Sequence, residues 1–514
     1  MSIFGFSSGD VVAAVLGGWL AMGVIRRLLL CIRLAGLPGP WATAVSHVPH
    51  SRAMLSGDCH SWYAQISKKY GPVARVAPGV LITSSPEIWA YVNNHPGYKR
   101  SDWYYHAARV EYRRDNVFTQ TDNDKHTQRR KQMAPGYSGR ENQELEPAID
   151  ERVREFLALI KDKYISTSGR VVPVDMAKKI QYFTLDVITG VGLGKPFGML
   201  RADADVDGYL SSIEQGLLAA NFALAAGVSW MAQAPLVGPY IAPGPHKKDA
   251  FGGMMAKCFR FVDERMWEDT GKRSDMLASF ARHGLQGDEL RSEALEQIIA
   301  GSDTTAGAIR GVLLLVMTNP RVCARLQEEI DAAVREGKTT AGEGDVISFA
   351  EAKTLPYLQA VIRESLRVRP PVVNIFPRDV PPGGDMVDIG DGKSVFLPEG
   401  ACIGYSATAM HLNKAVYGQD AAAFRPERWF EPDADKLAAM VRTNELIFGH
   451  GKWSCLGKPV AQLELSKVVF EIFRHFDLAP MDAAAPWKAA NYLGLFVISD
   501  MWVQVMERQD ARLE

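Results

Sequence analysis

The run Phe448-Gly449-His450-Gly451-Lys452-Trp453-Ser454-Cys455-Leu456-Gly457 is the most informative stretch of this 514-residue chain. It leads into an apolar-striped segment that begins at Pro459. A cysteine at the mouth of a helix gains from the partial positive charge there, and its thiolate is the form that binds a metal. The glycines let the backbone approach a flat cofactor and point amide groups at the sulfur. A lone cysteine is otherwise a small buried hydrophobic residue, and these neighbours favour the metal-binding interpretation.

Composition excludes several classes of protein. The chain is 47% hydrophobic and 23% charged, which is typical of a globular protein with a large core. A formal net charge of -1 gives no basic surface for nucleic acid, so we expect no nucleic-acid partner. The six cysteines include no C-x-x-C pair, and neither an iron-sulfur cluster nor a zinc site is indicated.

The amino-terminal stretch Val11 to Ile25 is apolar and uncharged, and Arg26 and Arg27 follow it at once. It is shorter than the roughly 20 residues of a typical membrane span, so its flanks must help it to cross. A cleaved signal peptide carries its positive charge before the apolar core, which is the reverse of this order. We therefore predict a membrane anchor over residues 1–35, a proline-containing hinge over 36–60 and a catalytic domain over 61–514.

The rest of the chain predicts a mainly α protein with a small β region. Val73 to Val76 and Val80 to Thr83 read as a hairpin, and Val395 to Leu397 give a weaker strand signal. Long helices are expected over Leu295 to Met317 and after Pro320 and Pro356. The apolar stretch from 217 to 234 is interpreted as a core helix, with a flexible lid near the membrane as the alternative.

The cysteine run resembles the haem-binding signature of the cytochrome P450 superfamily, Phe-x-x-Gly-x-Arg-x-Cys-x-Gly, with Phe448, Gly451, Cys455 and Gly457 in register. The resemblance implies the P450 fold and haem b (iron protoporphyrin IX), with Cys455 as the axial ligand of the iron. Trp453 stands where most relatives carry Arg or His, and an indole offers one neutral donor. The haem propionates would then depend more on other cationic groups.

A second motif, Ala300-Gly301-Ser302-Asp303-Thr304-Thr305, lies inside the long apolar helix. Polar groups buried there cost free energy unless each finds a partner, and Gly costs about 1 kcal/mol relative to Ala. One interpretation is a local kink, with Thr bonded back to the preceding turn. The run also resembles the family's acid/alcohol motif, which implies a groove for O2 where Asp303 and Thr304 relay protons.

Glu364 and Arg367 are spaced to share one helix face, which alone is typical of an ordinary ion pair. The run from Phe424 to Trp429 resembles the family's second arginine motif, and the resemblance adds Arg428 to the pair. One carboxylate between two guanidiniums fixes geometry more than it adds stability. We assign Glu364, Arg367 and Arg428 to structure and haem retention.

Three further residues are candidates for the haem propionates. His126 and Arg130 are similar to the family's Trp/His-x-x-x-Arg pair, and Arg378 follows Phe376-Pro377. Each could instead be a solvated charge.

The resemblance, with fungal members near the pisatin demethylase group, implies a monooxygenase that inserts one atom of O2 into a lipophilic small molecule. Electrons would come from NADPH-cytochrome P450 reductase on the endoplasmic reticulum membrane, with this chain single-pass and its catalytic domain cytoplasmic. Lys452 and Lys458 could dock that partner or simply be solvated.

By family analogy, substrate contacts are expected from mostly apolar and aromatic residues. These are Tyr104, Tyr105, His106, Ile299, Val373, Asn374, Phe376 and Leu495. The resemblance favours a tailoring step in fungal secondary metabolism, on a terpenoid or polyketide. A xenobiotic or fatty-acid hydroxylase, a haem-thiolate isomerase or dehydratase that needs no reductase, and a non-catalytic haem sensor or carrier are the alternatives.

Overall fold

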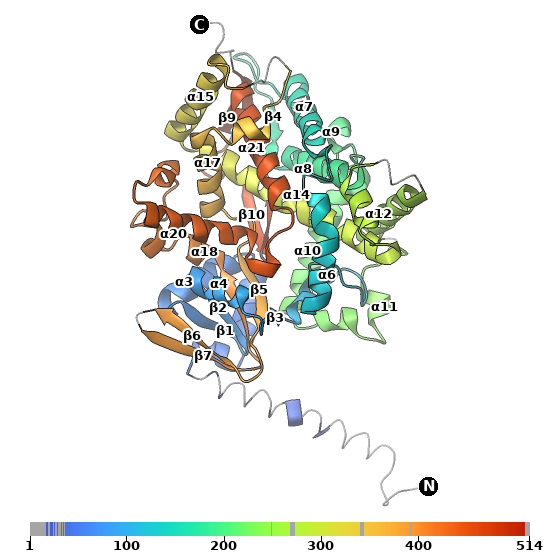
Figure 1. The fold of residues 1–514 in the computed structure, drawn as a ribbon, viewed down its shortest axis with the longest axis vertical. Helices are drawn as coiled ribbons and strands as arrows, with labels where there is room; N and C mark the ends of the chain where they lie inside the picture. The colour runs from blue at the N-terminus through green and yellow to red at the C-terminus, as the bar shows by residue number, and fades with distance from the viewer. Residues whose placement is uncertain are drawn as a thin grey trace, which may run out of the picture.

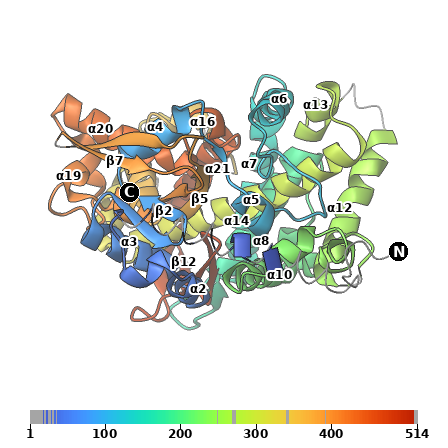
Figure 2. The same ribbon diagram turned by 90° about the horizontal axis from the view of Figure 1, so that it is seen from below.

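The computed structural model describes residues 36–247, 249–267, 273–339, 344–390 and 392–508, with isolated positions between 17 and 34. The predicted anchor therefore lies mostly outside the described residues. Helices occupy most of the molecule, and strands gather toward one side of it (Figures 1 and 2). The predicted mainly α architecture with a small β region is confirmed.

The helices run in chain order around a central one. They are α2 (Val48–Leu55), α3 (Cys59–Tyr70), α4 (Pro86–Asn94), α5 (Trp103–Ala107), α6 (Asn123–Met133), α7 (Leu145–Lys163), α8 (Met176–Leu193), α9 (Met199–Ala202), α10 (Tyr209–Ala225), α11 (Gly238–Ile241), α12 (Ala250–Trp267), α13 (Met276–Arg282), α14 (Gly287–Met317), α15 (Pro320–Arg335), α16 (Phe349–Ala352), α17 (Pro356–Val368), α18 (Ala407–His411), α19 (Lys414–Tyr417), α20 (Ala434–Glu445) and α21 (Lys458–His475).

Short 3-10 turns connect several of these helices. Those used below are η1 (Trp41–Ala44), η2 (Ala134–Tyr137), η4 (Ser229–Gln233), η6 (Pro426–Phe430), η7 (Leu446–Phe448) and η8 (Gly451–Trp453).

The largest sheet has the strand order β1-β2-β8-β5-β3. Its strands are β1 (Val73–Ala77), β2 (Val80–Thr83), β3 (Lys99–Arg100), β5 (Asn374–Asp379) and β8 (Cys402–Ser406). The predicted hairpin is confirmed, since β1 and β2 pair antiparallel with Val73 opposite Thr83.

Smaller sheets complete the β region, in the orders β4-β12-β9, β10-β11 and β6-β7. Their strands are β4 (Pro173–Asp175), β6 (Asp385–Gly390), β7 (Lys393–Leu397), β9 (Phe476–Pro480), β10 (Lys488–Tyr492), β11 (Leu495–Ser499) and β12 (Trp502–Glu507). The weak strand signal near Val395 is therefore confirmed as part of β7.

The central helix α14 packs against α8, α12, α17 and α21. A Cβ atom at Gly301 would lie 2.7 Å from Ile188 of α8, so this glycine lets the two helices approach closely. Among the described residues, α14 is the one helix long and apolar enough to span a membrane, and most of its apolar window is buried inside the protein. It is thus the core helix around which the fold is built.

The predicted hinge is fastened to the sheet. Arg75 of β1 is buried and donates to the carbonyl oxygens of Leu34 (2.6 Å) and Leu37 (3.2 Å). A side chain at Gly39 would collide with the Arg75 carbonyl oxygen at 2.6 Å. This lead-in therefore has a fixed path along β1.

The interpretation of residues 217–234 as a core helix is wrong for much of that stretch. Helix α10 ends at Ala225, and Leu218, Phe222 and Trp230 are at least half exposed. The reason lies in the packing, because α10 lies at the edge of the molecule against α2 and α12 and presents one apolar face outward.

Candidate functional site

Cys455 lies in the short loop between η8 and the start of α21. Its amide donates to the Phe448 carbonyl oxygen at 2.7 Å, which closes the loop. Gly449 (φ 74°) and Gly451 (φ 58°) adopt left-handed backbone angles, and a side chain at Gly451 would lie 2.7 Å from Asn94 Oδ1. These two glycines are thus required by the loop's own path.

The Cys455 sulfur is an exposed thiol in a crowded setting. Burial by the surrounding protein raises its pKa, while the backbone amides of Gly457 and Lys458 and the charge of Arg130 lower it. A residue that is reachable by solvent yet desolvated faces a hollow inside the molecule. The predicted position at a helix mouth is confirmed, because α21 begins at Lys458.

Helix α14 carries a solvent-accessible stripe in its otherwise buried central part. Ala300 is exposed, and Ile299, Asp303 and Thr304 are half-buried, whereas the residues from Thr305 to Leu314 are buried. Their spacing places Ile299, Ala300, Asp303 and Thr304 on one face. This face therefore lines an internal hollow.

Asp303 is held from α8. Gln181 Nε2 donates to Asp303 Oδ1 at 2.5 Å and to Ser302 Oγ at 2.8 Å, and Arg310 donates to Gln181 Oε1 at 2.7 Å. Burial raises the pKa of Asp303 to about 6, although Arg310 and Gln181 act in the opposite direction. Thr304 Oγ1 donates to the Ala300 carbonyl oxygen at 2.8 Å, which is the back-bonded geometry expected for a helical Thr.

A second cluster surrounds Trp453 and Arg378. Arg378 of β5 donates to Tyr104 OH at 2.7 Å and to Asn93 Oδ1 at 3.1 Å, and its guanidinium carbon lies 4.3 Å from the centre of the Trp453 ring. Lys452 Nζ lies 4.4 Å from the same ring centre. The indole is buried, and its Nε1 atom has no hydrogen-bond partner in the described residues.

His126 of α6 is buried with neither ring nitrogen bonded within the described part of the chain. Burial lowers the pKa of His126 to about 2, and Arg100, Arg130, Arg378 and Lys452 lower it further. Four cations thus converge on one neutral imidazole. Arg130 itself donates to the Ser454 carbonyl oxygen at 2.6 Å and to Ser454 Oγ at 3.3 Å, so it binds the cysteine loop directly.

These residues fit a haem. A pocket that gathers several cations and leaves the Trp453, His126 and Arg378 Nε nitrogens buried without partners matches an anionic group such as a propionate pair. The accessible Cys455 thiol beside it matches a single axial ligand. No group of three His, Cys, Asp or Glu side chains within the described ranges could hold a bare metal ion.

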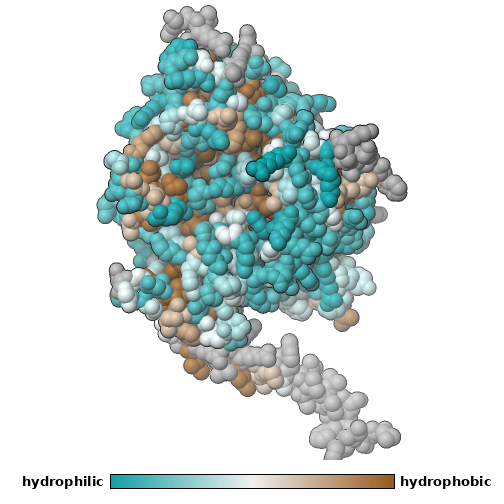
Figure 3. All heavy atoms as spheres, viewed as in Figure 1, coloured by the Kyte–Doolittle hydropathy of each residue, from teal (hydrophilic) through white to brown (hydrophobic). Residues whose placement is uncertain are grey.

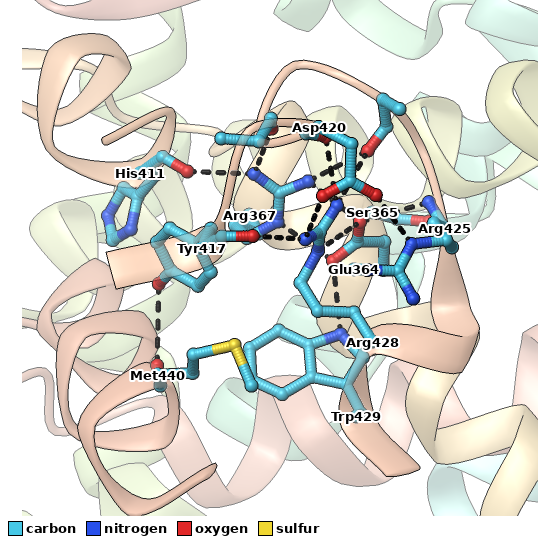
Figure 4. Close-up of polar contacts among 12 residues, drawn as sticks. Glu364, Ser365, Arg367, His411, Tyr417, Asp420, Arg425, Arg428, Trp429 and Met440 are labelled. Atoms are coloured by element: carbon cyan, nitrogen blue, oxygen red, sulfur yellow. Dashed lines mark hydrogen bonds and ion pairs between the residues drawn. The ribbon is translucent and has the colours of Figure 1, made fainter. Parts of the chain in front are cut away.

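The predicted arginine network forms a closed structure (Figure 4). Glu364 and Arg367 are fully buried and share two hydrogen bonds of 2.7 and 2.8 Å, and Arg428 Nε donates to Glu364 at 3.2 Å. Trp429 Nε1 and the Arg425 amide also donate to Glu364, at 3.1 and 3.0 Å. Arg367 further binds three backbone carbonyls, those of His411, Ala421 and Ala423.

The predicted substrate residues fall into two places. Tyr104, Tyr105, His106 and Phe376 lie near α5 and β5, where Trp103, Tyr104, Phe118 and Phe376 form an aromatic cluster. The Tyr104 hydroxyl is bonded to Arg378, and the Tyr105 hydroxyl shares a 2.5 Å hydrogen bond with Thr121. These contacts hold both tyrosines against the wall, and their role toward a substrate stays a prediction.

The other predicted substrate residues meet where β5 approaches β11. The Val373 amide donates to Gly494, and Val372 bridges Leu495. Asn374 is buried with Oδ1 unpartnered in the described residues, and with Asn221 it lines a cavity of about 10 Å³. Asn221 also borders an open recess of about 460 Å³ between α2 and α10. Cys455 lines neither space.

Sequence reasoning missed Arg100, Gln181 and Tyr137. Arg100 acts on His126, Gln181 holds Asp303, and the pKa of the buried Tyr137 is raised by burial and by the nearby Cys455. None belongs to a motif of regular spacing, and each joins the site through contacts between distant segments. The chain alone offers no signal that would have identified them.

The profile of the cytochrome P450 family matches residues 37–499. The chain is 38% identical to cytochrome P450 monooxygenase ABA1 of Pyricularia oryzae, over 93% of each chain. It is 35% identical to cytochrome P450 monooxygenase aba1 of Botryotinia fuckeliana, over 93% of this chain and 92% of that protein. Pisatin demethylase of Fusarium vanettenii is 28% identical, over 88% and 87%.

Proposed function

The chain belongs to the cytochrome P450 monooxygenase family, and from this we propose that it inserts one oxygen atom from O2 into a lipophilic small molecule. The observation that carries the proposal is the accessible Cys455 thiol at the start of α21, beside a cationic pocket and inside the same fold as the accessible face of α14. The fungal relatives support a tailoring step in secondary metabolism, on a terpenoid or polyketide.

Members of this family bind haem through a cysteine thiolate, and we assign haem b to this site. When bound, the haem supplies the iron that activates dioxygen and delivers an oxygen atom to the substrate. Cys455 would hold the iron as a thiolate, helped by the amides of Gly457 and Lys458. Arg130, Arg378 and His126 would hold the propionates, with Trp453 Nε1 as a further donor.

Asp303 and Thr304 would deliver protons. A carboxyl group whose pKa is about 6 can both take up and release a proton near neutral pH, and Gln181 fixes its position. The Thr304 hydroxyl uses its hydrogen for the Ala300 carbonyl, so its oxygen is free to accept one from Asp303. This pair supports oxygen activation over the haem-thiolate isomerases and dehydratases, which need no external protons.

Exposed apolar side chains support a membrane location. They gather on the neighbouring elements η1, α2, α10, η4 and α11, at the end of the molecule from which the amino-terminal segment departs (Figure 3). The set is Trp41, Val45, Val48, Leu55, Leu218, Phe222, Trp230, Leu236, Tyr240 and Ile241. We propose a single-pass anchor over residues 1–35, a hinge over 36–60 and a cytoplasmic catalytic domain over 61–514 at the endoplasmic reticulum.

P450 monooxygenases use O2 and typically a separate reductase, and we propose NADPH-cytochrome P450 reductase as the partner. Lys452 and Lys458 lie beside Cys455, although Lys458 is paired with Glu445 and Lys452 lies over Trp453. A Lys452→Glu variant should therefore slow the reductase-driven rate and change its salt dependence. Equal rates and equal salt dependence would remove the docking role.

The reduced carbon monoxide spectrum tests the proposed function directly. Thiolate ligation moves the Soret band strongly to the red, and we expect this band in the full chain purified from membranes. The Cys455→Ser variant should lose the band and also NADPH-dependent turnover in a reductase-coupled host. A variant that keeps both would overturn the proposal.

A further inference from the structure

The accessible stripe of α14 extends one turn beyond the family motif, to Glu296. Between Ser292 and Leu314 the accessible positions that share one helix face are Glu296, Ile299, Ala300, Asp303 and Thr304. Their spacing of three and four residues places Glu296 on the face that carries Asp303 and Thr304. Glu293, one turn earlier, is fully buried and pairs with Arg129 at 2.6 Å. Glu296 therefore belongs to the lining of the hollow, whereas Glu293 belongs to the core.

One carboxyl oxygen of Glu296 is already used. Asn116 Nδ2 donates to Glu296 Oε2 at 2.9 Å. The orientation of Asn116 is fixed, because its Oδ1 accepts hydrogen bonds from the amides of Phe118 and Thr119 at 3.0 and 2.9 Å. Oε2 is therefore an acceptor, and any proton on the carboxyl group lies on Oε1.

Glu296 holds that proton at neutral pH. Burial raises the pKa of Glu296 to about 8, Glu293 raises it further, and Asn116 and Arg100 act in the opposite direction. The Oε1 atom has no hydrogen-bond partner within the described ranges, so the carboxyl group presents one unused donor to the hollow. Leaving a donor unpaired in a desolvated place costs free energy, which a ligand acceptor would recover.

We propose that Glu296 is a specificity-determining residue that donates a hydrogen bond to an oxygen atom of the substrate, a carbonyl or hydroxyl oxygen on an otherwise apolar molecule. The inference rests on the proposed function, because it assumes that the hollow beside Cys455 is the substrate pocket. Tyr137, whose pKa is raised by both Cys455 and Glu296, places the carboxyl group and the sulfur within electrostatic reach of one phenol. The nearby Arg100 disfavours a cationic ligand.

Paired probes of one skeleton test this proposal. Camphor with camphane, and cedrol with cedrane, differ by the oxygen, and their dissociation constants follow from substrate-induced shifts of the Soret band in the haem-loaded full chain. Wild type should bind each oxygenated member about five- to tenfold more tightly than its hydrocarbon, as expected for one buried hydrogen bond. Glu296→Leu should abolish this preference, and Glu296→Gln, which keeps an N–H donor, should retain it.

Glu293→Gln is the matched control, because it removes an acidic group one turn away that does not face the hollow. It should leave the preference unchanged. The proposal is overturned if wild type shows no preference for the oxygenated members or binds no probe, or if Glu296→Leu keeps the preference. A missing red-shifted carbon monoxide band in every protein would instead refute the haem-thiolate assignment, so the two failures are distinguishable.

Discussion

The Arg378 guanidinium lies over the Trp453 indole, with its carbon atom 4.3 Å from the ring centre. Trp453 stands where most relatives have Arg or His, and Lys452 Nζ lies 4.4 Å from the same ring. The indole thus contacts two cations without adding a third charge. Cation–π contacts of this kind contribute about 0.5 to 2 kcal/mol, more where the cation is desolvated.

Restoring the usual arginine should weaken haem binding. In Trp453→Arg a third cation would sit against Arg378 and Lys452, and like charges at this distance repel. We expect faster transfer of haem to apomyoglobin than in wild type, with Trp453→Phe intermediate because it keeps the ring but loses the N–H group. The double variant Trp453→Arg/Lys452→Ala should recover part of the loss. Slower haem transfer from Trp453→Arg than from wild type would contradict the cation–π assignment.

Breaking the buried arginine network should be costly. Glu364→Gln leaves two buried guanidiniums without their carboxylate, and we expect a loss of about 3–5 kcal/mol in the free energy of unfolding, or no folded haem protein. The control is Asp420→Asn, because Asp420 binds the same Arg428 at 2.9 Å but is 43% exposed. That change should cost about 1 kcal/mol or less. Urea midpoints compare the two, and equal costs would argue against burial as the cause.

Removing the Arg130 side chain should release haem. Arg130→Ala loses the bonds to Ser454 that hold the cysteine loop, and it removes one of the cations around His126. We expect most of the haem to be lost on gel filtration, measured as haem per polypeptide. Ser454→Ala keeps the stronger bond to the carbonyl oxygen and should retain its haem. Full retention in Arg130→Ala would refute the assignment of this residue.

His411 should make the protein sensitive to mild acid. Burial lowers the pKa of His411 to about 3, and the Arg367 charge lowers it further. The unfolded chain binds a proton below its ordinary pKa of 6.5, whereas the folded chain does not until about 3. Stability is therefore lost as the pH falls below 6.5, by about 1.4 kcal/mol per pH unit and about 2 kcal/mol at pH 5.

A His411→Phe variant isolates this effect, since its carbonyl still accepts from Arg367. The difference in unfolding free energy between wild type and variant should change by that amount between pH 7 and pH 5. A difference that stays constant over this range would show that His411 is protonated in the folded protein.

Local patterns predicted a large part of this fold. The β1–β2 hairpin, the helix after Pro356 and the helix start behind Cys455 follow from turn residues, proline and apolar spacing, which act over a few neighbouring positions. The pairing of Glu364 with Arg367 followed from spacing on one helix, and Arg428 joined it only through family resemblance.

Residues 217–234 show the limit of that reasoning. Apolar periodicity there fits a core helix and a surface helix equally, and only the packing of α10 against α2 and α12 decides which face is covered. The same holds for Gly301, whose small size is used by Ile188 of α8.

By itself the sequence determined the thiolate loop, the acid and alcohol of α14 and the arginine network, because each is written in residues close along the chain or on one helix. Only the tertiary structure decided that Arg100 reaches His126, that Gln181 holds Asp303 and that Asn116 leaves one oxygen of Glu296 unused. Those contacts join segments far apart in the chain, and their energies depend on burial and distance, which no spacing rule encodes.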